Sequence, residues 1–215
     1  MSLTLTGAAG FATWDDLERA ARSCVACGLA EGRTQVVFGV GRRDPVLMLV
    51  GEGPGAEEDR RGEPFVGRAG GLLTALLADI GLRRDDTYIA NVVKCRPPNN
   101  RDPAPDEIAA CRPYLDAQIR FCAPRVIVTL GNVATRALLG TREGITKLRG
   151  RSFPLPGAGE VTVIPTLHPA AVLRTGGVAL AQVRADFVRV KRALAGVPAA
   201  GSVRPAGAPG PEGRV

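Results

Sequence analysis

Short apolar runs alternate with helical stretches along the chain. The apolar runs are typical of buried strands, and they lie at residues 46–50, 88–93, 126–130 and 161–166. The stretches between and around these runs predict helices at residues 14–23, 70–80, 105–121, 132–139 and 178–194. Thr13 is a suitable N-cap for the first of these helices, and Gly81 stands where a helix C-terminal glycine is expected.

Strands that alternate with helices predict crossover connections and a mainly parallel sheet. The expected fold class is α/β, with three layers (α/β/α) around a central, mainly parallel sheet of four strands. A chain of 215 residues is long enough for one such domain, which we place at residues 13–195. Residues 1–12 are expected to be a flexible N-terminus. Residues 196–215 are rich in Pro, Gly and Ala, and we expect a disordered tail there.

Glycines and polar residues follow the ends of all four predicted strands. The run GEGPGAEED at residues 51–59 follows the first strand, and Asn91 lies near the end of the second. Gly131 and Asn132 follow the third strand, and His168 follows the fourth. Because parallel strands end at one edge of a sheet, where α/β proteins bind ligands, these groups are expected to converge on one site.

The balance of charge favours a polyanionic partner. Lys and Arg total 28 against 21 Asp and Glu, a formal net charge of +7. Arginine supplies most of this excess, and its planar guanidinium donates two parallel hydrogen bonds to a phosphate. An inert basic surface remains an alternative interpretation. No apolar run is long enough to span a bilayer, and the first residues do not resemble a secretory signal, so we expect a cytoplasmic protein.

The cysteines form a spaced set. Cys24 and Cys27 make a C-x-x-C pair, and fifteen residues separate Cys95 from Cys111 further along the chain. Four thiolates could hold a zinc ion or an iron–sulfur cluster. Two other interpretations stay open, small buried apolar residues or a redox pair. Disulfides are disfavoured by the expected compartment, and Cys122 is assigned to the core.

The chain contains one histidine, His168, beside the rigid Pro169. A single histidine excludes zinc proteases of the H-E-x-x-H type, and the G-x-S-x-G elbow of α/β-hydrolases is missing from the sequence. A hydrogen-bonded structural histidine is the alternative to a role in a site. The neighbouring proline and the position after a strand favour the site.

These motifs together resemble the family 4 uracil-DNA glycosylases, which are the iron–sulfur type. The resemblance covers about residues 14–194, and it rests on the order and spacing of the motifs with the four cysteines. The matching motifs are GEGPG at 51–55, PFVG at 64–67, ANVVKCRPP at 90–98, ITKLRG at 145–150 and HPAA at 168–171. It implies a uracil-DNA glycosylase-like fold and a 4Fe–4S cluster on Cys24, Cys27, Cys95 and Cys111.

The resemblance also implies an activity and a substrate. A monofunctional glycosylase of this family flips uracil out of DNA and hydrolyses its N-glycosidic bond, leaving free uracil and an abasic site for base-excision repair. By the motifs, Asn91 bonds the uracil edge in two-point fashion, since its amide offers a donor and an acceptor, and Phe65 stacks on the base. A neutral His168 and the backbone amide of Gly53 donate hydrogen bonds to the uracil oxygen that gains charge.

The carboxylates of the first motif are assigned in the same way. Glu58 is expected to position water and favour the cationic sugar, with Glu52 as a supporting contact. The best-known uracil glycosylases carry an aspartate where this chain has Gly53, and family 4 generally lacks that aspartate as well. A solvated helix N-terminus, which acidic residues stabilise, is the alternative interpretation of residues 57–59.

DNA backbone contacts are expected from Lys147, Arg149 and Arg174. Leu173 is the candidate wedge that fills the space of the flipped base, and ordinary packing is the alternative for it. The expected partner is uracil-containing DNA. The protein is expected to be a monomer and to have no membrane partner.

Two alternatives to a glycosylase differ from it in the residues that they require. A covalent uracil-binding variant of the superfamily would need an inserted basic loop with a second histidine, which this chain lacks. A catalytically silent DNA-binding or redox-sensing iron–sulfur protein would keep the cysteines and the basic surface. Such a protein would not need Asn91, Glu58 and His168 together.

Overall fold

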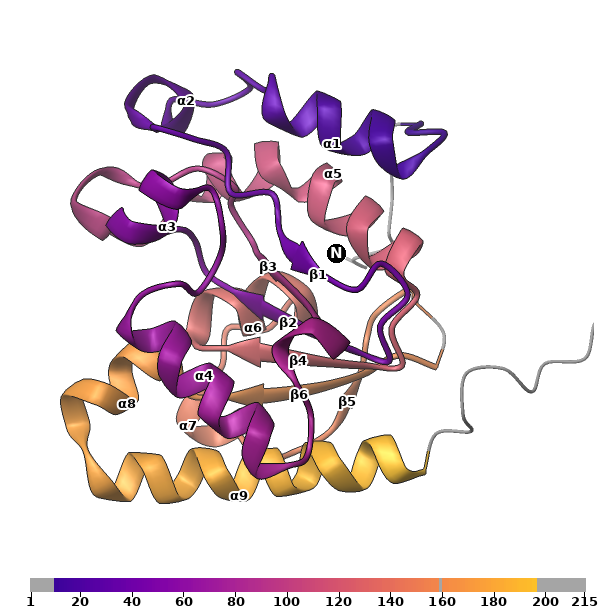
Figure 1. Ribbon diagram of the computed structural model, residues 1–215, viewed down its shortest axis with the longest axis vertical. Helices are drawn as coiled ribbons and strands as arrows, with labels where there is room; N and C mark the ends of the chain where they lie inside the picture. The colour runs from indigo at the N-terminus through magenta and orange to yellow at the C-terminus, as the bar shows by residue number, and fades with distance from the viewer. Residues whose placement is uncertain (1–9, 159, 197–215) are drawn as a thin grey trace, which may run out of the picture.

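A single six-stranded sheet organises the computed structural model, which describes residues 10–158 and 160–196 (Figure 1). The strands stand in the order β1-β3-β2-β4-β6-β5. Their bounds are β1 (Val40–Gly41), β2 (Leu47–Gly51), β3 (Tyr88–Asn91), β4 (Val126–Leu130), β5 (Phe153–Pro154) and β6 (Thr162–Thr166). Most of the predicted N-terminal segment and nearly all of the predicted tail lie outside the described residues.

The four inner strands β3, β2, β4 and β6 are parallel, as the sequence predicts. The strands β1 and β5 add to the two edges in antiparallel orientation. Each edge strand has two residues, which is too short to show an alternating pattern in a sequence. The four-stranded parallel sheet is therefore confirmed as the centre of a wider mixed sheet.

Five helices confirm the sequence predictions to within two or three residues at each end. They are α1 (Trp14–Arg22), α4 (Arg68–Asp79), α5 (Pro105–Cys122), α6 (Asn132–Leu139) and α9 (Gly177–Ala195). The hydroxyl of Thr13 caps α1 by accepting a hydrogen bond from the amide of Asp16 at 3.1 Å. Gly81, just beyond α4, adopts a φ of +83° that favours glycine.

Most short helices were not predicted, because one or two turns show little helical periodicity; the helix N-terminus given as the alternative for residues 57–59 is present. They are α2 (Leu29–Gly32), α3 (Ala56–Arg61), α7 (Ile145–Leu148), α8 (Pro169–Thr175) and the 3-10 turns η1 (Arg84–Asp86) and η2 (Pro98–Asn100). Several of them follow strands, so these short elements carry much of the site described below.

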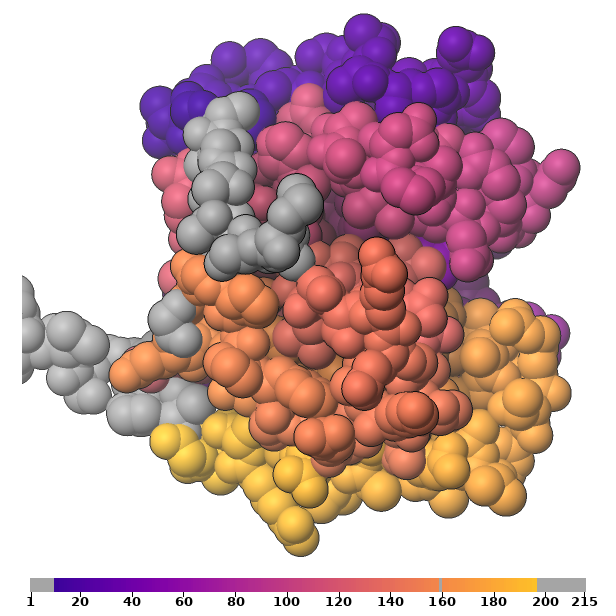
Figure 2. Space-filling model, turned by 180° about the vertical axis from the view of Figure 1, so that it is seen from behind, coloured from indigo at the N-terminus to yellow at the C-terminus, as the bar shows by residue number. Residues whose placement is uncertain are grey.

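Helices cover both faces of the sheet and complete the three predicted layers (Figure 1). Met48 and Val50 point to the face covered by α5 and α6, whereas Leu47 and Leu49 point to the face covered by α4 and α9. Strands buried on both faces are apolar throughout, which explains the unbroken run at residues 46–50. Seen from behind, the segment with α6 and α7 lies between α5 and α9 (Figure 2).

The strand order indicates where on the sheet a ligand would bind. From the central β2 the chain moves first to β3 on one side and later to β4 and β6 on the other. Such a reversal leaves a crevice at the carboxyl ends of the strands, where ligands bind in α/β folds. In the described residues, no helix combines the length and the apolarity needed to cross a membrane.

Candidate active site and cysteine pocket

A cavity of about 390 Å³ opens at the carboxyl edge of the sheet. Its wall is built by the loop after β2, the start of α3, the end of β3, the loop that follows β3, and the start of α8. The residues of the predicted site that line it are Glu52, Gly53, Glu58, Phe65, Asn91, His168 and Arg174. The structure thus brings together side chains that lie more than a hundred residues apart in the sequence.

Asn91 ends β3 directly opposite Gly51, the last residue of β2. A β-carbon on Gly51 would lie 2.4 Å from Oδ1 of Asn91 and 2.7 Å from Cζ of Phe65, so only glycine leaves room for both side chains. Asn91 is 1% exposed. Among the described residues, its Oδ1 is the only buried side-chain polar atom without a hydrogen-bond partner. A buried acceptor without a partner is costly, which indicates that a ligand supplies the missing donor.

Phe65 lies in a turn that Glu58 holds. One carboxylate oxygen of Glu58, Oε1, accepts hydrogen bonds from the amides of Val66 and Gly67, each at 3.1 Å. The Phe65 ring is 7% exposed, and its centroid lies 5.7 Å from that of the His168 ring, tilted by 31°. The aromatic ring and the imidazole therefore form adjoining parts of one wall.

His168 is the N-cap of α8, and its ring is fixed by the backbone. The amide of Ala170 donates to Nδ1 at 3.1 Å, so Nδ1 carries no proton and Nε2 carries the hydrogen of the neutral ring. Burial, and to a smaller extent the charge of Arg174, lower the pKa of His168 to about 4 against the opposing effect of Glu58. The imidazole is thus a neutral hydrogen-bond donor at neutral pH.

The acids of the cavity differ in their surroundings. Burial and the nearby carboxylate of Asp102 raise the pKa of Glu52 to about 7. A carboxyl group with this pKa takes up and releases a proton near neutral pH. Glu58 lies in the first turn of α3, where the helix dipole favours its negative charge. It also holds the two amides described above, so it positions the Phe65 turn as well as lining the cavity.

Three residues predicted to contact DNA lie outside the cavity wall. Lys147 on α7 is exposed, and Leu173 on α8 is 42% exposed, next to Arg174. Arg149 is different, because its guanidinium pairs with the buried Asp186 at 2.8 Å and also donates to the carbonyl of Gln182. Its charge neutralises a carboxylate within the fold, so the phosphate contact of Arg149 stays a prediction that competes with this ion pair.

One wall of the cavity was not predicted from the sequence. The loop after β3 contributes Pro97, Asn100, Arg101 and Asp102. Arg101 makes a bidentate ion pair with Glu107 at 2.6 and 2.8 Å, which ties this loop to the start of α5. The run PPNN was available as a turn signal, but nothing local shows which side of a turn faces a ligand.

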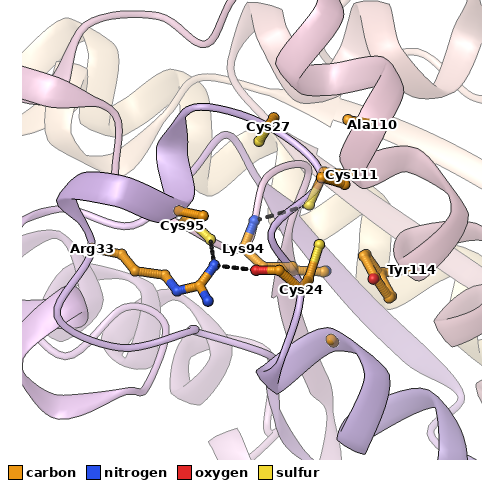
Figure 3. A pocket seen from close by; sticks show the side chains of 11 residues that line it. Cys24, Cys27, Arg33, Lys94, Cys95, Ala110, Cys111 and Tyr114 are labelled. Carbon is orange, nitrogen blue, oxygen red and sulfur yellow. Dashed lines mark hydrogen bonds between the residues drawn. The ribbon is translucent and has the colours of Figure 1, made fainter.

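The four spaced cysteines line a second, separate pocket (Figure 3). Cys24 and Cys27 lie between α1 and α2, Cys95 follows β3, and Cys111 belongs to α5. The guanidinium of Arg33 donates to Sγ of Cys95 at 3.4 Å and to the carbonyl of Cys24 at 2.6 Å. The amide of Lys94 donates to Sγ of Cys111 at 3.3 Å.

Thiolate charge in the cysteine pocket depends on compensating positive charge. Burial raises the pKa of Cys111 to about 11 and raises that of Cys95, so ionised sulfurs here need the nearby cations or a bound metal. In the part of the chain that the structure describes, no three His, Cys, Asp or Glu side chains converge tightly enough to hold one metal ion. Cys122 lies apart in the core at 3% exposure, as predicted, and none of the five cysteines forms a disulfide.

Comparison with known proteins agrees with this fold and cavity. Residues 38–191 match the family model of the Uracil DNA glycosylase superfamily. The chain belongs to this superfamily, and within it to the type-4 group. It is similar to the Type-4 uracil-DNA glycosylase of Thermotoga maritima, with 54% identity over 154 residues, 71% of this chain and 79% of that protein.

Two further relatives show that the chain is more similar to type-4 than to type-5 enzymes. The Type-4 uracil-DNA glycosylase of Archaeoglobus fulgidus is 47% identical over 164 residues, 74% of this chain and 82% of that protein. The Type-5 uracil-DNA glycosylase of Pyrobaculum aerophilum is 32% identical over 166 residues, 70% of this chain and 72% of that protein. The resemblance that the motifs indicated is confirmed.

Proposed function

We propose that this protein is a monofunctional uracil-DNA glycosylase that flips uracil out of DNA and hydrolyses its N-glycosidic bond. The observation that carries the proposal is the buried, unpartnered Oδ1 of Asn91 at the base of a cavity of about 390 Å³. The ring N–H of uracil is a donor of the kind this oxygen lacks, and the amide group of Asn91 can donate to the neighbouring uracil oxygen. Cytosine carries an acceptor at that ring position.

Flipping is required because the bond to be broken is buried in a duplex. Extruding a nucleotide costs a few kcal/mol, which stacking and hydrogen bonding in the pocket offset. Phe65 supplies the stacking face. Arg174, which lines the cavity and is exposed, and Lys147 are proposed to hold DNA phosphates. Leu173, exposed on the same helix as Arg174, is proposed to fill the gap in the base stack.

Hydrolysis then requires charges of both signs to be stabilised. The N-glycosidic bond breaks with its electron pair on uracil, and the sugar becomes oxocarbenium-like. The Nε2–H of the neutral His168 and the amide of Gly53 donate to the uracil oxygen that gains charge, an interaction worth about 3 kcal/mol for each preorganised donor. Glu58 favours the cationic sugar and orients the water whose oxygen bonds to the sugar carbon. The proton of that water passes to a cavity carboxyl, Glu58 or Glu52.

We also propose a 4Fe–4S cluster on Cys24, Cys27, Cys95 and Cys111. Four cysteines from distant parts of the sequence line one pocket, with N–H donors on two of the sulfurs. A single zinc ion needs all its ligands close to one point, whereas a cubane cluster takes one thiolate on each of four irons. The looser arrangement of these sulfurs supports the cluster, whose task is to tie the N-terminal segment to the loop after β3 and to α5.

The cluster has a direct test that does not depend on activity. Protein purified without added chelator should be brown with broad visible absorbance, and it should contain iron and sulfide. Replacing Cys111 with Ser should lower the iron content, whereas Cys122→Ser serves as the matched control because Cys122 lies outside the pocket. Colourless protein that contains zinc would contradict the cluster.

The activity is tested by excision. A duplex oligonucleotide with one uracil is incubated with the protein without metal or nucleotide, beside a thymine control, and free base and abasic site are measured. We expect release of uracil only. Asn91→Asp should weaken uracil recognition. Intact uracil DNA bound tightly by brown protein would favour a silent DNA-binding iron–sulfur protein instead.

The expected setting of the protein is also a proposal. We propose a cytoplasmic monomer. Size-exclusion chromatography with light scattering checks the monomer against its mass of 22.4 kDa. A stable dimer would contradict this part of the proposal and leave the excision chemistry untouched.

A further inference from the structure

The turn that carries Phe65 holds a strained backbone. Phe65 has a φ of +55°, a region that residues other than glycine rarely adopt. Such a conformation costs about 1–3 kcal/mol and persists only where the surroundings enforce it. The contacts that enforce it here come from two other segments of the chain.

One of these contacts acts on the amides of the turn. Oε1 of Glu58 accepts hydrogen bonds from the amides of Val66 and Gly67, the two residues that follow Phe65. A carboxylate that accepts two amide hydrogen bonds makes charge-assisted bonds, which are stronger than neutral ones. The side chain on α3 therefore fixes the turn from its C-terminal side.

The other contact acts on the carbonyls of the turn. Nη1 of Arg84 donates to the carbonyl of Phe65 at 3.0 Å, and Nη2 donates to the carbonyl of Pro64. Arg84 begins the 3-10 turn η1, nineteen residues beyond Phe65. The planar guanidinium suits two adjacent acceptors, which a lysine ammonium on a flexible stem does not match.

Gly70 on α4 makes room for this arrangement. A β-carbon at Gly70 would lie 1.7 Å from the carbonyl oxygen of Phe65 and 2.2 Å from its carbonyl carbon. The carbonyl that Arg84 holds thus rests directly against the backbone of α4. The position of the Phe65 carbonyl is determined by a helix on one side and a cation on the other.

We propose that Arg84 is a positioning residue for the stacking of the flipped base: it and Glu58 clamp the turn so that the Phe65 ring is held in place before substrate arrives. The inference rests on the proposed function, because the ring position matters only if a base stacks on it. Both terminal nitrogens of Arg84 are used by the two carbonyls. This distinguishes Arg84 from the exposed Arg174, which is free to reach a phosphate.

Arg83 offers a matched control. Its side chain is 77% exposed and pairs with Asp86 in the next turn, so Arg83→Met removes the same charge one residue away from the clamp. Arg84→Met removes both hydrogen bonds to the turn. Arg84→Lys keeps the charge and can satisfy only part of the arrangement.

The test is a double-mutant cycle between Arg84→Met and Phe65→Ala, read as kcat and KM on a uracil oligonucleotide. We expect Arg84→Met to lower kcat/KM roughly ten- to a hundredfold when Phe65 is present, with little further loss in the Phe65→Ala background. Arg84→Lys should recover part of the activity, and Arg83→Met should match the unmodified chain. If Arg84→Met does not fold, the same cycle is measured with Arg84→Lys.

Three results would overturn the proposal. Equal losses from Arg84→Met in both backgrounds would show that Arg84 does not act through Phe65. A decrease of about one in the salt slope of DNA binding would make Arg84 a phosphate contact. If Arg83→Met lost as much activity as Arg84→Met, the change in net charge alone would explain the effect. Failure of the proposed function looks different, because the unmodified chain would then release no uracil.

Discussion

His168 shows how a fold sets the state of one side chain. The amide of Ala170 occupies Nδ1, and burial lowers the pKa of the ring to about 4. In the unfolded chain the same ring titrates near pH 6.5. The sequence could place this histidine after a strand, but its tautomer and its low pKa come from the helix start and the surrounding walls.

The lowered pKa makes stability depend on pH with a defined sign. Between about pH 6.5 and pH 4 the unfolded chain binds a proton at His168 that the folded chain does not, so this residue lowers stability as the pH falls. We expect the unmodified chain to lose more unfolding free energy than His168→Gln when the pH falls from 7 to 5. Urea unfolding at each pH measures it, and a constant difference would contradict the lowered pKa.

Catalysis by His168 should depend on the same neutral imidazole, with its hydrogen on Nε2. Removing one preorganised donor costs about a hundred- to a thousandfold in kcat in other enzymes. We therefore expect His168→Ala, which removes the donor, to lower single-turnover excision by about this factor, with DNA binding nearly unchanged. An imidazole that is neutral above about pH 4 should impose no loss of activity near pH 6.5. A loss of DNA binding as large as the loss of excision would contradict the electrostatic role.

Two adjacent glycines on α4, Gly70 and Gly71, are expected to respond to alanine in opposite ways. Gly70 faces the Phe65 carbonyl, and a β-carbon there would overlap backbone atoms, whereas a β-carbon on Gly71 meets nothing within 4 Å. Gly70→Ala should displace the Phe65 turn and lower kcat/KM. Gly71→Ala should raise stability by about 0.5–1 kcal/mol, since alanine is the better helix former. Equal behaviour of the two variants in excision and thermal unfolding would contradict the geometry.

The long helices and the parallel strands were predictable because each has a continuous local pattern. The apolar run at residues 46–50 is buried on both faces, and α5 and α9 extend over many turns. The short α8 was not predictable as a helix, although its residues were recognised as a motif, and α3 was indicated only by its acidic residues 57–59. Pairings between distant residues, such as Arg84 with the Phe65 carbonyl or Arg149 with Asp186, could not be predicted from local patterns.

The end of β3 illustrates how one element joins the two pockets. Lys94 is 2% exposed, and its Nζ donates to the carbonyl of Asn91 at 2.8 Å and to Oε1 of Gln118 on α5 at 2.5 Å. Gln118 in turn donates to the carbonyl of Phe38 and to the hydroxyl of Tyr88. A buried cation thus links the strand end that carries Asn91 to the helix that carries a cysteine of the second pocket.

Breaking this link should cost stability. Lys94→Met leaves the Gln118 oxygen and the Asn91 carbonyl without a donor, and each unsatisfied buried group costs about 1–3 kcal/mol. We expect a clear drop in the urea midpoint together with weaker uracil recognition. Lys191→Met is the matched control, because Lys191 is exposed on α9 and surface changes are usually within about 0.5 kcal/mol. Equal unfolding midpoints for the two variants would show that the link is not stabilising.

The architecture gathers a cavity and a cysteine pocket around one loop. Cys95 precedes this loop and Cys111 follows it, and between them Pro97, Asn100 and Arg101 form a wall of the cavity. The cysteine pocket therefore adjoins the loop that forms one wall of the candidate active site. Only the folded chain brings these two regions together, because sequence spacing shows the cysteines as a set but does not show which wall they adjoin.

The cations behind the net charge of +7 are of two kinds, those exposed to DNA and those paired within the fold. Each phosphate contact adds about 0.9 to the salt slope of binding to duplex DNA. Arg174 is exposed at the cavity, so Arg174→Gln should reduce the slope by about one and leave stability unchanged. Arg149 pairs with the 3%-exposed side chain of Asp186. Arg149→Gln should therefore lower stability by leaving that carboxylate unpaired, with no change in slope; a reduced slope with unaltered stability would restore Arg149 as a DNA contact.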